Sequence, residues 1–255
     1  SAVSLERLSS RFSGLKDLAG KGSLQADLTL SGPLKAPAVR GPVSSERLSA
    51  KGETFEALRA GFVLSGETVT VTSLSARWNQ AVLSGKGTIG QVRSETPVLN
   101  FSGTASGLET GAFASRVKDL ETLQLSGTGT ADWKVSGTGK DLAFGAAFSS
   151  NRLETPEIRL SGMKADVKGR IQEKAETIPL EIRFSTEAAA WGKVRAEAVS
   201  GSLTRTKDGF EVPAFSARLA GGQVKGSGRM IPGKDKEPAR LDFKADAAGV
   251  GLQTL

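Results

Sequence analysis

Apolar and polar residues alternate along most of the chain. The segments 22–32, 141–150 and 177–186 each place an apolar residue at every second position, with polar residues between them. A period of two is typical of β-strands that have one apolar and one solvated face, and such strands occur mainly in antiparallel sheets. Segments rich in Gly and Pro, such as 31–37 and 231–238, separate the strands as turns. The pattern predicts an all-β protein with about 14–16 strands.

Two segments depart from this period. Residues 4–20 and 107–123 place their apolar residues three or four positions apart, which is the spacing of one face of an α-helix. Gly20 follows the first segment as a stop signal. We therefore expect short helices within an otherwise β-rich chain.

The chain repeats itself over a long distance. The segment "FSARLAGGQVKGSGRM" (215–230) matches "LSARWNQAVLSGKGTI" (74–89), 141 positions earlier and without a gap. Long-period similarity in a strand-rich chain indicates stacked units that share a core. We expect one continuous β-groove segment over residues 1–255, excised from a longer protein. Its internal units would cover about 5–107 and 108–251, with a third beginning at 252.

The composition removes most of the side chains that carry catalysis. The 255 residues include no His, no Cys and no Tyr, so Ser-His-Asp sites, Cys-His sites and His- or Cys-ligated metal sites are excluded. Asp and Glu fall mostly in expected turns or on the polar face of expected strands. We predict that the protein is not an enzyme, has no catalytic residue, and holds no metal or cofactor.

The basic residues do not form a nucleic-acid-binding pattern. The net charge is +7, with 34 Lys and Arg against 27 Asp and Glu. The basic residues are scattered along the chain, and Phe residues fall on the apolar face rather than among them. No nucleic-acid partner is therefore expected. No apolar run is long enough to span a bilayer, and no signal peptide is visible.

The apolar faces of the expected strands mix large and small residues. Leu, Phe and Trp alternate with small residues such as Gly85, Gly87, Ala146, Gly226 and Gly228. Small residues leave volume for a ligand, although they also ease bending of a sheet. The same positions therefore fit either an apolar groove or a closed core. The candidate groove-lining residues are Leu28, Leu30, Leu58, Phe62, Leu64, Val69, Val71, Leu83, Ile89, Leu99, Phe101, Trp133, Val135, Leu142, Phe144, Phe148, Ile182, Phe184, Phe210, Val212, Phe215, Val224, Leu241 and Phe243.

Residues 28–90 contain a recognisable series of short motifs. "SGPLKAP" (31–37) is a Gly-containing turn that ends in Pro, "RGPVSSERL" (40–48) is a Gly-led strand that ends in Leu, and "LSGKGTI" (83–89) is a strand with alternating Gly. This combination resembles the AsmA-like family, which includes the TamB-like bridge-type lipid transport proteins of the bacterial periplasm. The second unit departs from the pattern, because it loses the Pro after the turn and has extra strands between 153 and 203.

The resemblance implies an elongated, curved antiparallel sheet, described as a β half-pipe or taco, with an apolar interior groove. It also implies a periplasmic location in a double-membraned bacterium, with an anchor in the inner membrane and a role in moving phospholipid to or from the outer membrane. The family offers no catalytic residue to carry over, so the lack of catalytic side chains here agrees with it.

We therefore predict that the chain carries phospholipid acyl chains in the groove, with the headgroups at its Lys- and Arg-bearing rim. Its partners would be phospholipid and the two membranes, reached through parts outside this chain. Two other functions fit the same residues. One is a scaffold or chaperone for outer-membrane protein biogenesis, which would add a client strand to a sheet edge by β-augmentation. The other is a structural adhesin with a closed, dry core.

Overall fold

A computed structural model gives the structure of the chain. The residues that it describes are 2–4, 21–33, 37–50, 52–115, 124–173, 178–207, 209–231 and 240–251. The chain forms two compact units. Unit 1 comprises Ser1–Gly107 and Asp132–Leu142, and unit 2 comprises Leu108–Ala131 and Ala143–Leu255. The internal repeat boundaries expected from the sequence stay a prediction.

Nearly all of the described residues belong to β-strands, as the period of two predicts. The first half of the chain contains β1 (Ala2–Ser4), β2 (Lys21–Ala26), β3 (Thr29–Ser31), β4 (Ala38–Ala50), β5 (Glu53–Ser65), β6 (Thr68–Trp78), β7 (Ala81–Gly90), β8 (Val98–Glu109) and β9 (Ser126–Thr138). The second half contains β10 (Asp141–Glu154), β11 (Ile158–Gln172), β12 (Leu180–Trp191), β13 (Val194–Arg205), β14 (Phe210–Leu219), β15 (Gly222–Ile231) and β16 (Arg240–Ala248).

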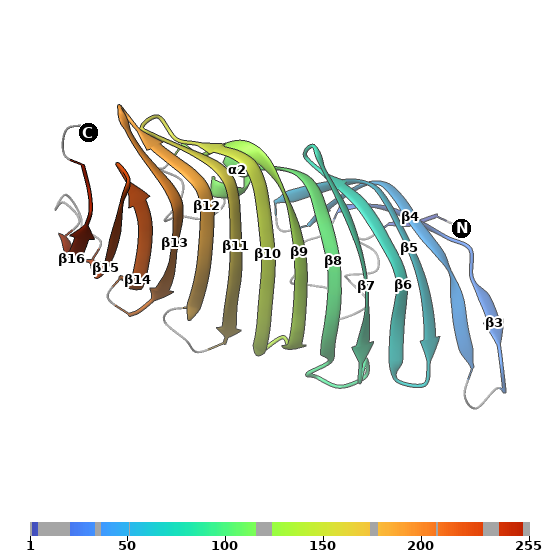
Figure 1. Ribbon diagram of the computed structural model, residues 1–255. Coiled ribbons are helices and arrows are strands. Elements are labelled where there is room, and N and C mark those ends of the chain that lie inside the picture. Colours follow the sequence, from blue (N-terminus) through green and yellow to red (C-terminus); the bar gives the residue numbers. More distant parts are fainter. Residues whose placement is uncertain are drawn as a thin grey trace. The chain divides into compact units, whose positions relative to one another are not determined.

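Each strand pairs with its neighbours in the sequence. The hydrogen-bonded order follows the chain from β1 and β2 through β4 to β16, and β3 pairs with β4 off this path. Among the described residues the order begins at β1 and ends at β16 without closing into a ring. Within each unit the strands also bend along their length (Figure 1). The predicted all-β class with a curved, open, antiparallel sheet is therefore confirmed.

Short turns join many of the strands. Two residues separate β5 from β6, β6 from β7 and β12 from β13, and the first residue of each turn has a positive φ: 60° at Gly66, 53° at Asn79 and 57° at Gly192. Gly and Asn adopt this conformation at low cost. The β13–β14 connection is longer. Its ends are held together by the pairing of Arg205 with Phe210 and by a hydrogen bond from the amide of Thr206 to the carbonyl of Gly209 at 2.8 Å.

The bends recur 141 residues apart. In β5 an extra residue lies between the pairs Glu56↔Arg77 and Arg59↔Ser75, and in β13 one lies between Glu197↔Arg218 and Ser200↔Ser216. The left-handed residue within each β-bulge is an alanine: Ala57 with φ 49° and Ala198 with φ 48°. A bulge increases the local bend and twist of a strand. The sequence repeat is therefore also a repeat of backbone shape.

Three buried hydroxyl groups lie in other bent strands. Ser45 Oγ in β4, Ser150 Oγ in β10 and Thr186 Oγ1 in β12 each donate to the carbonyl two residues further along the same strand, at a distance of 3.0 Å in every case. Ser150 and Thr186 also lie 2.6 and 2.5 Å from a carbonyl oxygen of the preceding strand. These bonds satisfy backbone groups where the bend disturbs the ladder.

Helical structure is limited to one short element among the described residues. Within the segment 107–123, helix α2 covers Thr110–Ala114, and β8 extends to Glu109. The helix therefore begins later than the sequence spacing predicted, since β8 extends into the start of that segment, and residues 116–123 lie outside the described residues. The helix expected at 4–20 lies outside the described residues, apart from Ser4 in β1.

Few side chains are buried. In the described part of the chain, the buried apolar residues are Ala76, Ala81, Ala105, Ala114 and Leu153, and no large side chain is fully buried. The apolar side chains among the described residues are therefore mostly half-buried or exposed.

Candidate apolar binding face

In unit 1, cross-strand pairing aligns the apolar residues of five strands. One row contains one residue from each of β4 to β8: Gly41, Phe62, Val71, Gly87 and Phe101. A parallel row contains Val39, Leu64, Val69, Ile89 and Leu99, and a third contains Val43, Ala60, Leu74, Gly85 and Gly103. Directly paired residues lie on the same face of a sheet. Together the three rows form what we call the apolar face of unit 1.

Unit 2 has an equivalent face. Its longest row crosses six strands, from β11 to β16, and contains Ala165, Phe184, Gly201, Phe215, Gly226 and Ala245. With neighbouring strands about 4.8 Å apart, this row is about 24 Å wide. A second row, Val167, Ile182 and Leu203, lies beside it. These rows form the apolar face of unit 2.

Aromatic rings on both faces lie over glycines of neighbouring strands. A Cβ atom placed on Gly87 would lie 2.5 Å from Cδ1 of Phe101, and one on Gly201 would lie 2.8 Å from Cζ of Phe184. Further contacts of this kind join Phe144 to Gly169, Phe148 to Gly129, Phe215 to Gly226 and Phe243 to Gly228. Each ring thus fills the space of a missing side chain and lies close to the backbone.

Trp133 extends this arrangement over two strands of unit 1. Cβ atoms placed on Gly103 and Gly85 would lie 2.6 and 3.1 Å from its Cζ2 atom. Gly85 and Gly103 pair directly across β7 and β8, and Trp133 belongs to β9, the next strand in the sheet order. The indole therefore spreads over a pair of glycines and forms part of the apolar face.

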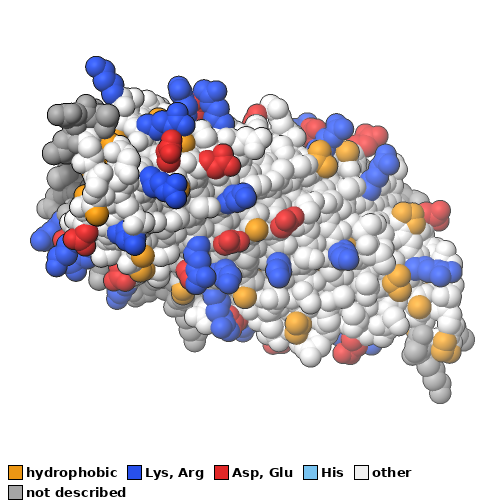
Figure 2. Space-filling model, in the orientation of Figure 1, with side chains coloured by type: hydrophobic (Ala, Val, Ile, Leu, Met, Phe, Trp, Pro, Cys, Tyr) orange, Lys and Arg blue, Asp and Glu red, His pale blue; other side chains and the backbone are white. Residues whose placement is uncertain are grey.

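The opposite face of each sheet is polar. In β11, Lys164, Asp166 and Lys168 are exposed and alternate with half-buried Ala165 and Val167. Figure 2 shows Lys, Arg, Asp and Glu side chains dispersed over the face in view, with few hydrophobic side chains among them. Opposite charges also pair across strands, as at Arg229 and Asp242, whose Nη2 and Oδ2 atoms are 3.4 Å apart. Among the described residues, the aligned apolar rows therefore lie on one side of the sheet in each unit.

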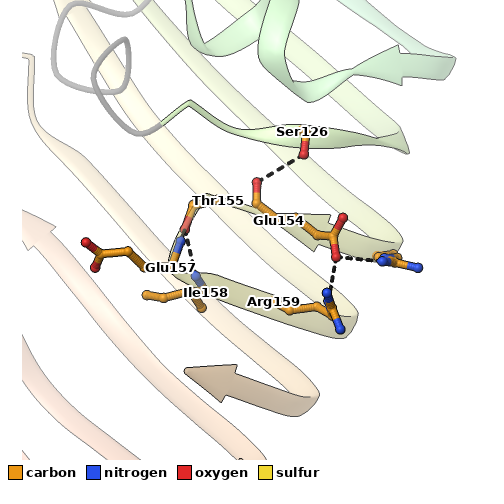
Figure 3. A network of polar contacts seen from close by, with 7 residues as sticks. Ser126, Glu154, Thr155, Glu157, Ile158 and Arg159 are labelled. Atoms are coloured by element: carbon orange, nitrogen blue, oxygen red, sulfur yellow. Dashed lines mark hydrogen bonds and ion pairs between the residues drawn. The ribbon is translucent and has the colours of Figure 1, made fainter. Parts of the chain in front are cut away.

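A polar network closes the turn between β10 and β11 (Figure 3). The carboxylate oxygen Oε1 of Glu154 accepts hydrogen bonds from Arg152 Nη2 at 2.7 Å and Arg159 Nε at 2.6 Å. These two guanidinium groups lower the pKa of Glu154 below its usual value. In the turn itself, Thr155 Oγ1 accepts from the amide of Ile158 at 2.9 Å. The charged groups of Arg152, Glu154 and Arg159 thus pair with one another beside the turn, so the network serves to fix the hairpin.

The structure places most predicted lining residues on the two apolar faces or in the same strands. Leu28, Leu30 and Phe243 are exposed, and the side chain of Leu241 lies outside the described residues. All the other candidates are half-buried, and none is buried. Leu28 lies between β2 and β3 rather than in a strand, so it has no register on the face. Pairing unites Phe62, Val71 and Phe101 in unit 1, and Phe184 and Phe215 in unit 2.

Sequence reasoning missed three of the larger apolar residues of the unit 1 face. Val39, Val43 and Leu74 lie in its rows, but Pro42 interrupts the alternation beside the first two, and the β-bulge after Val71 changes the period before Leu74. It also missed Gly103, Gly129, Gly169 and Gly201 as places beneath aromatic rings. The sequence does place these glycines at apolar-face positions. Which aromatic ring covers each glycine, however, depends on the register of the neighbouring strand.

The two faces offer apolar contact rather than reactive groups. Among the described residues, no three His, Cys, Asp or Glu side chains gather as a metal site would require. The part of the chain covered by the structure also contains no helix with the length and apolarity needed to cross a membrane. Comparisons with family models, with curated proteins and with solved structures found no match.

Proposed function

We propose that the apolar faces bind the acyl chains of phospholipid, and that the chain is the periplasmic segment of a bridge-like lipid transfer protein. The observation that carries this proposal is the half-buried state of the aligned Leu, Val, Ile and Phe residues, none of which is fully buried among the described residues. A protein that used these residues only as a core would be expected to enclose the larger ones.

The geometry of the faces favours a long, flexible, apolar ligand. The rows are continuous across several strands, and their rings lie over glycines of neighbouring strands. Burial of a methylene group is worth about 0.8 kcal/mol, so an acyl chain gains affinity along its whole length without a specific polar contact. Such binding permits movement along a face, because neighbouring positions on it are chemically alike.

The resemblance to the AsmA-like family supports the wider setting of the proposal. Under it, the protein lies in the periplasm of a double-membraned bacterium, is anchored in the inner membrane, and carries phospholipid between the inner and outer membranes. The polar face of each sheet would then contact the aqueous periplasm, while headgroups would remain at the hydrated edges of the apolar faces.

Native mass spectrometry with lipid extraction tests the proposal directly. The protein would be purified from bacteria without detergent and then incubated with phospholipid vesicles. We expect co-purifying phospholipid that is lost in Phe184→Glu and Phe144→Glu. The matched controls are Ser185→Glu and Ala143→Glu, which place the same charge at exposed neighbours on the opposite face and should retain lipid. Circular dichroism would establish that all four variants keep their β-structure.

Two results would contradict the proposal. One is a ligand-free mass both before and after incubation with vesicles, which would mean that the apolar faces are not available to lipid. The other is equal loss of lipid from the apolar-face variants and their controls, since binding would then not depend on the face to which the charge was added.

A further inference from the structure

We propose that Arg205 binds the phosphate group of a phospholipid whose acyl chains lie on the apolar face of unit 2. This role rests on the lipid binding proposed above, and it identifies the side chain that holds the head of the ligand. Arg205 is the last residue of β13, and the exposed Lys207 follows it in the hairpin. Arg205 therefore lies where the apolar face meets the solvent.

The strand register places Arg205 on the apolar face. Gly201, Leu203 and Arg205 occupy alternate positions of β13, and residues two apart in a strand share a face. Gly201 and Leu203 belong to the two rows of the apolar face of unit 2. Arg205 also pairs with Phe210, which in turn pairs with Met230. A guanidinium group thus shares this face with apolar side chains.

The burial of Arg205 distinguishes it from the other basic residues. Every other Lys or Arg side chain in the described part of the chain is exposed, whereas Arg205 is half-buried. Its guanidinium carbon Cζ lies 5.8 Å from the centre of the Phe210 ring, which is within the range of a cation–π interaction. The ring therefore favours a position of the cation beside the apolar face.

The internal repeat shows that an apolar residue fits the same position. In unit 1, Leu64 pairs with Val69, 141 residues before the pair of Arg205 and Phe210. Leu64 is also half-buried. Strand pairing at this place therefore does not require a cation, which favours a binding role for the Arg of unit 2.

A phosphate group suits this position chemically. A guanidinium group can donate two parallel N–H bonds to two phosphate oxygens, and such charge-assisted bonds are strong. It has five N–H donors, so it can bind a phosphate and an acceptor of the protein at the same time. Because Leu203 and Phe210 offer apolar contact beside it, an anion that carries its own acyl chains should bind more tightly than a free anion.

The test compares three ligands that separate the phosphate from the acyl chains. Dioctanoylphosphatidylglycerol, dioctanoylglycerol and inorganic phosphate would each be titrated into the full chain by calorimetry, with the lipids below the concentration at which they form micelles. The two lipids have the same acyl chains, but only the first has a phosphate. We expect the wild type to bind both lipids, the phosphatidylglycerol more tightly, and inorganic phosphate much more weakly than either.

Three variants test the side chain itself. Arg205→Leu installs the residue of unit 1 and should weaken binding of the phosphatidylglycerol about tenfold or more, with no loss in affinity for dioctanoylglycerol. Arg205→Lys should lose less, because it keeps the charge but not the paired N–H donors. The matched control is Arg183→Leu, which removes the same group from an exposed position on the opposite face, in β12. It should leave both affinities unchanged.

The outcomes separate this role from lipid binding itself. An unchanged affinity of Arg205→Leu for the phosphatidylglycerol would overturn the role of Arg205 alone, and so would an equal loss for both lipids, which would indicate a structural effect. An equal loss in Arg183→Leu would show that only the overall charge matters. Inorganic phosphate binding as tightly as the phosphatidylglycerol would indicate a site for free anions instead. If the wild type bound neither lipid, acyl-chain binding would be overturned together with this role.

Discussion

Phe215 lies directly opposite Gly226, and its ring occupies the space that a side chain on that glycine would need. A Cβ atom placed on Gly226 would lie 2.5 Å from Cε1 of Phe215 and even closer to the carbonyl oxygen of Lys244. The carbonyl belongs to the backbone of β16 and cannot rotate away. Gly226 is thus required both by the ring and by the adjacent strand.

We expect Gly226→Val to destabilise the protein by about 1–3 kcal/mol, the usual cost of overpacking. The urea midpoint measures this loss. Gly139→Val is the matched control, because no atom lies within 4 Å of a Cβ at Gly139 and its φ is not among the positive values. If both variants unfold at the wild-type midpoint, the contact between Phe215 and Gly226 carries no structural constraint.

The left-handed alanines give a second prediction. Ala198 has a φ of 48°, a conformation that costs an L-residue about 1–2 kcal/mol. Ala198→Gly would relieve this strain in the folded state, but it would also raise the conformational entropy of the unfolded chain. The net free energy of unfolding should therefore stay unchanged or rise by up to about 1 kcal/mol. Ala198→Val should lower stability by about 1 kcal/mol or more, because a branched side chain is strained further. Ala57, its repeat equivalent, should respond in the same direction. Equal urea midpoints for the Gly and Val variants would contradict the assigned backbone conformation.

Removal of a buried hydroxyl should disturb the bend in β12. Thr186 is 4% exposed, and its Oγ1 lies 2.5 Å from the Ser161 carbonyl oxygen and 3.0 Å from that of Ala188. Thr186→Val keeps the shape but removes the donor, so we expect a loss of about 1–3 kcal/mol in the free energy of unfolding. The hydroxyl of Thr130 contacts Ser149 on an exposed surface, so Thr130→Val should change stability by less than about 0.5 kcal/mol. Comparable losses in the two variants would show that the buried hydroxyl has no special role.

The Glu154 network predicts a pH dependence of stability. Hydrogen bonds from Arg152 and Arg159 hold the pKa of Glu154 below its ordinary value of 4.5. Because the folded-state pKa is the lower one, the stabilisation is fully present above pH 4.5 and is lost as the pH falls through the folded-state value. The wild type should therefore be more stable than Glu154→Gln at neutral pH, and the difference should shrink on acidification and at high salt. Urea titrations of both proteins across this pH range would measure the difference in their free energies of unfolding. A difference that grows on acidification would contradict the prediction.

The strands and the polarity of their faces could be read from the sequence. Phe62 and Leu64, or Phe184 and Ile182, lie two positions apart, and residues two apart share a face in any strand. Short turns such as those at Gly66 and Gly192 also agree with antiparallel pairing of consecutive strands, whereas the open form of the sheet was expected only from the family resemblance. The start of the second expected helix was predicted less well: residues 107–109 belong to β8, and α2 begins at Thr110.

Other features depend on contacts between strands, and local sequence does not encode them. Nothing about Ala57 or Ala198 as alanines signals a left-handed bulge; the register of the neighbouring strand imposes it. The contact of Trp133 with Gly85 and Gly103 likewise joins residues that are distant in the sequence.

The sequence by itself determined which residues are apolar neighbours along a strand, because side chains alternate with a period of two in every strand. Only the tertiary structure decided whether those residues are enclosed. Alternation is the same for a sheet that packs against a second layer and for one that does not, and the difference appears only in the exposure of residues such as Leu64, Phe101 and Phe184, which remain half-buried.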